Sequence, residues 1–262
     1  MHMRTKKWAR PELQACPFFV NSIKGPDSEP DILKGTWRGR FADPSLPLHL
    51  EMGCGKGVST AKMIADNPGV NYIASDLSPD VLGVARRNIT AACGENPGNV
   101  QLLLADICFV DKLFGPEDRP ERIYIHFCNP WTEHLRHEKR RLTHPRQLMQ
   151  YRSFLKAGGE IHFKTDDDTL FDDSLAYFDL CGYEPVFLTR DLHASGYGPN
   201  WVSEHEEKYM AQGVKIKFGL FRMKPETPDF DATRFHMNPV IRKDAVERME
   251  RLAAERQGGE NR

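Results

Sequence analysis

Residues 48–57 read Leu-His-Leu-Glu-Met-Gly-Cys-Gly-Lys-Gly, and this segment gives the clearest indication of the fold. Its first five residues are apolar enough for a buried strand, whereas the last five contain three alternating glycines: Gly53, Gly55 and Gly57. Glycine tolerates positive φ angles and lets the backbone approach a ligand closely. The stretch therefore predicts a strand, a ligand-binding turn and a helix that begins near Val58.

Further along the chain, strand-like and helix-like segments alternate. The predicted strands are 48–52, 71–75, 100–104, 122–128, 160–165, 183–188 and 214–221, and the predicted helices are 58–66, 79–92, 145–155 and 168–180. This alternation predicts a Rossmann-like α/β fold, in which a mostly parallel, seven-stranded sheet has helices on both faces. Ligands bind such sheets at the carboxyl ends of the strands, so residues that directly follow a strand are the candidates for the site.

The composition indicates a globular protein. The 262 residues include 36 Lys and Arg against 37 Asp and Glu, and the net charge of −1 excludes a uniformly basic nucleic-acid-binding surface but not a local basic patch. No segment approaches the roughly 18 apolar residues of a membrane helix, and no apolar segment typical of a secretion signal follows the basic start. Six scattered cysteines form no C-x-x-C pair. We therefore expect a cytoplasmic protein with reduced thiols, no membrane contact and no metal site.

Three regions follow from these patterns. We expect a basic N-terminal arm (1–45), a main domain (46–222) and a C-terminal tail (223–262) that contains a charged helix over about 238–257. The sequence leaves open whether the protein is a monomer or a homodimer.

The glycine-rich turn favours one class of cofactor over two others. A dinucleotide fingerprint would need glycine in place of Val58, and the P-loop spacing is also not met. The pattern E-x-G-x-G-x-G, which begins at Glu51, instead resembles that of methyltransferases that use S-adenosylmethionine. Glu51 would then suit the amino end of the methionine moiety, and Asp76 the ribose hydroxyls. Asp106 would lie near the adenine, a role that is compatible with capping a helix.

The segment after the fourth strand carries a family resemblance. Residues 129–131 read Asn-Pro-Trp and residues 136–141 read Arg-His-Glu-Lys-Arg-Arg. Together they resemble the tRNA (guanine-N7-)-methyltransferase family, whose mark is Asp-Pro-Trp followed by Arg-His-x-Lys-Arg-Arg. Further matches lie at 8–11, 34–37, 158–166 and 203–206, so that the resemblance spans about residues 8–222. It implies a class I methyltransferase that transfers a methyl group from S-adenosylmethionine to N7 of a guanosine in the variable loop of tRNA.

The resemblance also implies roles for single residues. By position, the family's cofactor acids correspond to Glu51, Asp76 and Asp106, and its catalytic aspartate corresponds to Asn129. Its substrate contacts correspond to Asp166, Ser203, Glu204, His205 and Glu206. Two departures are Asn129 in place of aspartate and Glu133 in place of a lysine.

The change at Asn129 is compatible with catalysis. Guanine N7 has an in-plane lone pair and no proton, so it needs no general base; the enzyme must align the reacting atoms and exclude water. We hypothesise that Asn129 orients the base, while Asp166 and Glu206 supply negative charge near the methylated guanine.

The basic cluster that follows suggests contact with RNA. Its residues Arg136, Lys139, Arg140 and Arg141 directly follow the presumed active-site strand, which favours phosphate contacts over a solvated surface. Trp131 either stacks on the guanine or packs its loop against the core.

Two other functions remain as alternatives. Asn-Pro-Trp is similar to the [Asp/Asn]-Pro-Pro-aromatic motif of adenine-N6 and related amino-group methyltransferases that act on nucleic acids. The other alternative is a tRNA-binding homologue whose catalysis is impaired by Asn129.

Overall fold

The computed structural model describes residues 5–23, 33–132, 135–232, 235 and 238–259. Its strands are β1 (Phe19–Asn21), β2 (Leu48–Met52), β3 (Asn71–Asp76), β4 (Val100–Leu104), β5 (Arg122–His126), β6 (Glu160–Thr165), β7 (Tyr183–Thr189) and β8 (Lys217–Met223). Its α-helices are α1 (Ala9–Gln14), α2 (Val58–Asp66), α3 (Pro79–Cys93), α4 (Val110–Leu113), α5 (Pro145–Phe154), α6 (Asp168–Leu180), α7 (Glu204–Met210) and α8 (Pro239–Gly259). Short 3-10 helices are η2 (Trp37–Arg40), η3 (Ile107–Phe109) and η4 (Leu135–Arg140).

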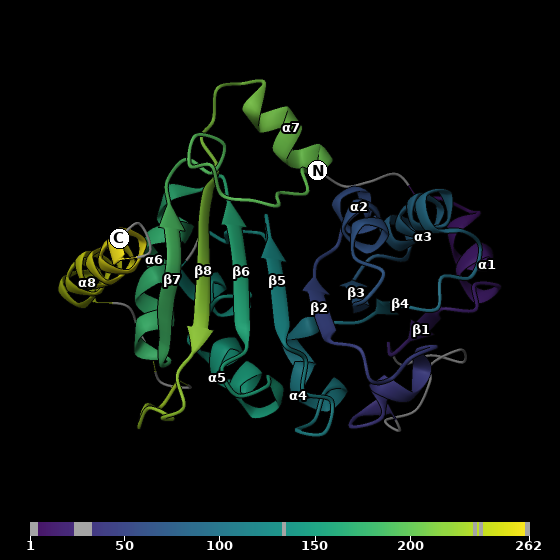
Figure 1. The fold of residues 1–262 in the computed structure, drawn as a ribbon, viewed down its shortest axis with the longest axis horizontal. Helices are drawn as coiled ribbons and strands as arrows, with labels where there is room; N and C mark the ends of the chain where they lie inside the picture. The colour runs from purple at the N-terminus through teal and green to yellow at the C-terminus, as the bar shows by residue number, and fades with distance from the viewer. Residues whose placement is uncertain (1–4, 24–32, 133–134, 233–234, 236–237, 260–262) are drawn as a thin grey trace.

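The described strands form one sheet in the order β1-β4-β3-β2-β5-β6-β8-β7 (Figure 1). All neighbours are parallel except β8, which is antiparallel to β6 and to β7. The predicted α/β fold is thus confirmed, with eight strands in the described residues rather than seven. The additional strand, β1, comes from the N-terminal arm and places Phe19 opposite Leu102 of β4. Three residues are too few to give a periodic signal in the sequence.

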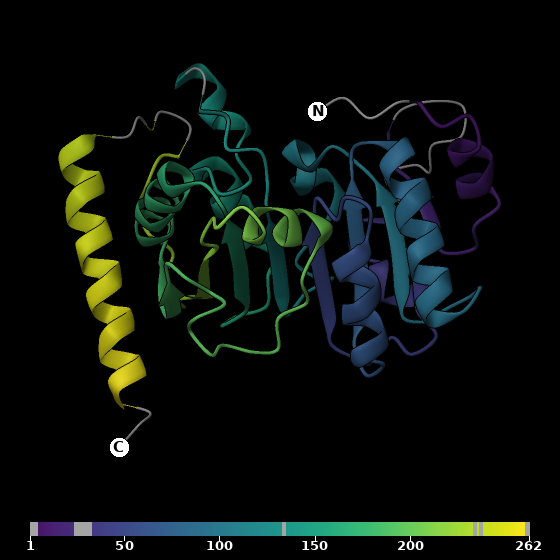
Figure 2. The same ribbon diagram turned by 90° about the horizontal axis from the view of Figure 1, so that it is seen from above.

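The sheet separates two apolar layers. Leu48, Leu50 and Met52 of β2 pack in one buried cluster with side chains of α5 and α6, whereas Tyr72 and Ala74 of β3 pack in another with α2 and α3. Alternate residues of a strand point to opposite faces, which is why both faces of this sheet are covered. Figure 2 shows the sheet between these helical layers, with α8 at the end of the molecule opposite α1.

Two of the differences between the predicted and the observed strand bounds have clear local reasons. β5 ends at His126 rather than Cys128, because Phe127 adopts a φ of 52° that a strand cannot continue. β8 begins at Lys217 rather than Val214, because the Val214 N–H donates to the Tyr209 carbonyl and so belongs to the turn that ends α7. The bounds of α2 and α6 agree with the prediction.

The C-terminal segments cover the other end of the sheet. Leu192, before α7, is buried with Ile216, Phe218 and Leu220, and α8 packs against β7 and α6. Of the helices in the described residues, none combines the length and the apolar character needed to cross a membrane.

Candidate active site

Three carboxylates lie at the carboxyl ends of three neighbouring strands. Glu51 is in β2, Asp76 ends β3 and Asp106 follows β4, and these strands lie side by side in the sheet. The register places Met52 opposite Ser75 and Asp76 opposite Leu104. Because parallel strands end at the same edge, the three carboxylates lie along one edge of the sheet.

Asp76 holds the glycine-rich loop. Its Oδ2 accepts a hydrogen bond from the Gly55 N–H at 3.1 Å, and its Oδ1 accepts one from the Ser78 N–H at 2.9 Å. Gly53, Gly55 and Gly57 have φ angles of 84°, 56° and 68°, which other L-residues rarely adopt. A side chain at Gly57 would also collide with Ala85 of α3, 2.8 Å from an added Cβ. Glycine at this position therefore serves both the turn and the approach of α3.

Asp106 has the capping role that the sequence suggested. Its Oδ1 accepts a hydrogen bond from the Cys108 N–H at 2.9 Å, and Asp106 is the N-cap of η3. The residue is partly exposed, so the cap leaves carboxylate surface available at the sheet edge.

Glu51 is the most buried of the three acids, at 3% exposure. Burial raises its pKa from 4.5 to about 7, against the opposing effects of a hydrogen bond from Thr60 and of the Lys164 charge. The Thr60 hydroxyl donates to Glu51 Oε2 at 2.5 Å. A cationic group that bound here would restore the ionised form, because an opposite charge favours the carboxylate.

A cleft with a volume of about 530 Å³ opens beside Glu51, whereas Asp76 and Asp106 are not part of its lining. Its walls are the glycine-rich loop with Glu51 on one side, and His126, Phe127 and α7 with the preceding Ser203 on the other. Lys56 Nζ lies 2.7 Å from Glu204 Oε2, so an ion pair joins the glycine-rich loop to α7 beside the cleft. The cleft thus combines a buried acid, loop backbone and an aromatic side chain. The Glu51 carboxylate fits the ammonium group of S-adenosylmethionine, and Asp76 and Asp106 at the neighbouring strand ends fit its ribose and adenine groups.

The segment after β5 has an unusual backbone. Phe127 and Trp131 have φ angles of 52° and 49°, which are uncommon for residues with bulky side chains. Asn129 is exposed, and its Oδ1 accepts a hydrogen bond from the Trp131 N–H at 3.0 Å. The Arg140 guanidinium lies 5.0 Å from the Trp131 ring centroid, a cation–π contact. The Asn129 side chain therefore holds the backbone of the loop at Trp131 while it remains exposed to solvent.

Arg141 does not face solvent, which corrects its prediction as a phosphate contact. The side chain is 1% exposed and pairs with Asp173 at 2.7 Å. Its Nε also donates to the Pro130 carbonyl at 2.6 Å. A run of basic residues gives no signal for which member turns inward, so the sequence could not show this. Lys139, Arg140 and Arg146 are exposed, whereas the side chain of Arg136 and both Glu133 and His134 lie outside the described residues.

The two carboxylates that were expected to supply negative charge differ in environment. Asp166 is partly buried, its Oδ1 lies 3.2 Å from His205 Nε2, and this hydrogen bond lowers its pKa. The His205 ring in turn contacts Phe127 in the cleft wall, with centroids 4.8 Å apart. Asp166 is therefore an ionised group next to the cleft.

Glu206, by contrast, is fully buried, which corrects its predicted role. It forms an ion pair with Lys164 at 3.3 Å and accepts a hydrogen bond from Asn200 Nδ2 at 2.9 Å. Its charge is balanced inside the protein and is not available to a substrate. Sequence reasoning assigned no role to Lys164; a lysine inside the apolar strand β6 was the signal that a buried carboxylate lay nearby.

Comparisons with known proteins also indicate a methyltransferase. A family model described as "Putative methyltransferase" matches residues 45–218. A tRNA (guanine-N(7)-)-methyltransferase of Clostridium perfringens is 52% identical over 221 residues, which are 83% of this chain and 97% of that protein. Proteins of the same name from Clostridium beijerinckii and Acetivibrio thermocellus are 48% and 45% identical over 227 residues, 86% of this chain and 99% and 100% of those proteins.

Among solved structures, the 16S rRNA methyltransferase KamB superposes with a TM-score of 0.50 at 12% sequence identity. The match covers 72% of this chain and 91% of that chain. At this identity the likeness shows the fold alone.

Proposed function

This chain belongs to the tRNA (guanine-N7-)-methyltransferase family, and we infer that it transfers a methyl group from S-adenosylmethionine to N7 of a guanosine in tRNA. The observation that carries the proposal is the shape of the cleft. One wall holds Glu51 and the glycine-rich loop, and the other holds Phe127, which directly follows β5 and precedes the Asn129 loop. A methyl donor and an acceptor base must meet in such a cleft.

On the donor side, we assign binding to the three strand-end acids. Glu51 would accept hydrogen bonds from the donor's ammonium group, Asp76 from its ribose hydroxyls, and Asp106 would lie at the adenine. Gly53, Gly55 and Gly57 let the loop backbone approach the donor. The bound donor supplies an electrophilic methyl group on a positively charged sulfur.

On the acceptor side, the residues have no proton to remove. Guanine N7 attacks with its own lone pair, so the protein's tasks are to align the base, to exclude water and to stabilise the positive charge that appears on the ring. We assign the first task to Asn129, which its bond to the Trp131 N–H holds in place. We assign the third to Asp166, whose lowered pKa keeps it ionised at neutral pH.

The exposed basic residues next to Trp131 suggest where the RNA lies. Lys139 and Arg140 follow the Asn129 loop and face solvent, and phosphates are bound by such side chains. Ser203, Glu204 and His205 form the opposite rim of the cleft and are assigned to the substrate. We propose the variable loop of tRNA as the target on the strength of the family motifs.

One experiment tests the proposal against both alternatives. The protein is incubated with unmodified tRNA and S-adenosylmethionine labelled on its methyl group, and the product is mapped by chemical cleavage at N7-methylguanosine. Cleavage at one guanosine of the variable loop supports the proposed function. Label on an exocyclic amine would establish an amino-group methyltransferase instead, and tRNA binding without label would establish a binding protein that has lost catalysis.

A further inference from the structure

The buried guanidinium of Arg141 joins the loop after β5 to helix α6. Its Nε donates to the Pro130 carbonyl at 2.6 Å, and one terminal nitrogen contacts Asp173 at 2.7 Å and the Tyr177 hydroxyl at 3.2 Å. Pro130 is in the loop after β5, whereas Asp173 and Tyr177 are in α6. A buried arginine with hydrogen bonds in two directions fixes the distance between the segments that it joins.

The bond to Pro130 acts on a single peptide group. The carbonyl of the Pro130–Trp131 peptide accepts from Arg141, and the N–H of the same peptide donates to Asn129 Oδ1 at 3.0 Å. Trp131, which contributes that N–H, has a φ of 49°. A bulky residue keeps such a backbone conformation where its surroundings impose it. The orientation of the Asn129 amide thus depends on the peptide that Arg141 holds.

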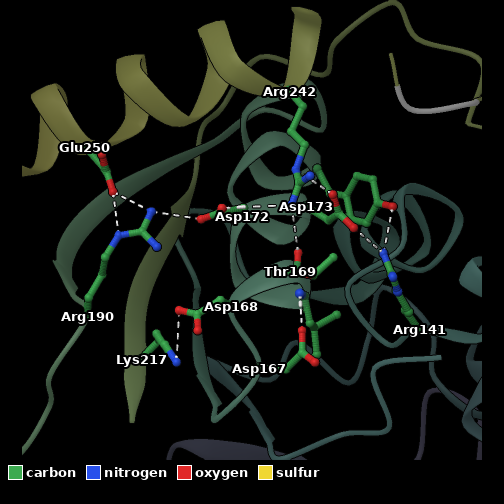
Figure 3. A network of polar contacts seen from close by, with 12 residues as sticks. Arg141, Asp167, Asp168, Thr169, Asp172, Asp173, Arg190, Lys217, Arg242 and Glu250 are labelled. Atoms are coloured by element: carbon green, nitrogen blue, oxygen red, sulfur yellow. Dashed lines mark hydrogen bonds and ion pairs between the residues drawn. The ribbon is translucent and has the colours of Figure 1, made fainter. Parts of the chain in front are cut away.

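The arrangement continues into the C-terminal helix. Arg242 of α8 places its Nε 2.8 Å from the other carboxylate oxygen of Asp173, so Asp173 lies between two arginines (Figure 3). The exposed Arg190 pairs with both Asp172 of α6 and Glu250 of α8. The family model ends at residue 218, before this helix begins. The helix that follows the shared domain therefore contacts the same carboxylate that supports Arg141.

We propose that Arg141 is a positioning residue, which sets the Pro130–Trp131 peptide and through it the Asn129 amide, and that Arg242 supports it by holding Asp173. The effect on catalysis rests on the proposed function. The effect on the loop does not, because it concerns contacts within the chain.

The test combines two measurements on the full chain. Hydrogen exchange at the Trp131 amide, followed by mass spectrometry without tRNA or donor, reports the loop directly. Methylation of tRNA, with kcat and KM determined separately, measures how a change in the loop affects catalysis. Arg141→Lys keeps the positive charge but loses the forked donor geometry. We expect at least tenfold faster exchange at Trp131 and at least tenfold lower kcat, while KM for tRNA and the Kd for S-adenosylmethionine stay within twofold.

Two helix α8 variants provide the matched comparison. Arg242→Gln removes the contact with Asp173, whereas Arg248→Gln removes an ion pair from the same helix to Asp179, which does not contact Arg141. We expect two- to threefold faster exchange at Trp131 for Arg242→Gln and wild-type exchange for Arg248→Gln. These two variants also test the proposal if Arg141→Lys does not fold.

Two results would overturn the proposal. One is a folded Arg141→Lys protein whose exchange and kcat both stay within twofold of the wild type. The other is equal exchange in the two α8 variants, which would mean that the contact between Arg242 and Asp173 does not support the loop. If the wild-type protein forms no N7-methylguanosine, the proposed function fails, and the exchange data alone still test the positioning role.

Discussion

The hydroxyl of Thr60 donates to Glu51 Oε2 at 2.5 Å, so this acid of the cleft wall is held by α2, the helix that follows the glycine-rich loop. The contact stabilises the ionised form of Glu51, yet burial outweighs it and raises the pKa to about 7. The charge of Lys164 also lowers this pKa, whereas that of Asp76 raises it. Glu51 therefore titrates near neutral pH in the ligand-free protein.

We predict that the affinity for S-adenosylmethionine rises with pH. If the ionised form of Glu51 binds the donor's ammonium group, a pKa of about 7 makes binding about tenfold weaker at pH 6 than at pH 8. Isothermal titration calorimetry at both pH values measures this, with Glu51→Gln as the control. The control should bind weakly at both values, and a wild-type Kd that is the same at pH 6 and pH 8 would contradict the assignment.

The same group should affect the stability of the ligand-free protein. An acid whose pKa is raised on folding stabilises the fold at low pH, because the folded state holds the proton more tightly. The contribution of Glu51 is thus fully present below its unfolded pKa of about 4.5 and is lost as the pH rises to about 7. Urea unfolding of the wild type and of Glu51→Gln between pH 5 and 8 should show a decline in the former that is reduced in the latter.

We predict that Asn129→Asp increases the rate of methyl transfer. The carboxylate keeps an oxygen for the Trp131 N–H and adds a negative charge near the guanine that becomes positive. At a protein surface such a charge is worth roughly 1–2 kcal/mol, or about tenfold in rate. Single-turnover kinetics with saturating donor measures the step. An unchanged or slower rate would show that Asn129 does more here than orient the base.

For Asp166→Asn we expect the opposite change. The substitution keeps the shape of the side chain but removes the charge next to the cleft, so kcat should fall by about tenfold or more. Because the hydrogen bond with His205 lowers the pKa of Asp166, the wild-type kcat should show no titration of this group near neutral pH. A kcat that survives Asp166→Asn unchanged would remove Asp166 from the mechanism.

The salt dependence of tRNA binding should distinguish two adjacent arginines. Arg140→Gln removes an exposed charge and should reduce the slope of log Kobs against log[salt] by about one. Arg141→Lys should leave the slope unchanged, because the side chain at position 141 is buried. Filter binding between about 50 and 200 mM salt measures both slopes. Equal slopes for the wild type and Arg140→Gln would place the RNA elsewhere.

Features that depend on a local sequence pattern, such as strands and the residues at their ends, could be predicted from the sequence. Short apolar runs located β2 and β3, and the rule that ligands lie at strand ends located Asp76 and Asp106. What it missed depends on contacts between distant segments. Glu206 and Glu51 are both glutamates. The residues adjacent to Glu206 in the sequence do not show that its partner is Lys164, 42 residues earlier.

The basic motif shows the same limit. In Arg-His-Glu-Lys-Arg-Arg, the residues at 140 and 141 are identical in type, and the one that turns inward is decided by Asp173 on α6. Helical periodicity could not show which arginine is buried, because η4 ends at Arg140 and does not include Arg141. Partners that fold against a segment from far along the chain thus decide between a surface role and a structural one.

The pairing of β1 with β4 has a consequence for biosynthesis. Phe19 lies opposite Leu102, so the chain emerging from the ribosome must lengthen by more than 80 residues before its first strand has a neighbour. Until then the backbone of β1 lacks the partner strand that it has in the finished protein, where Phe18 and Val20 are both buried. A nascent chain released before β4 is made would therefore present this short segment to chaperones.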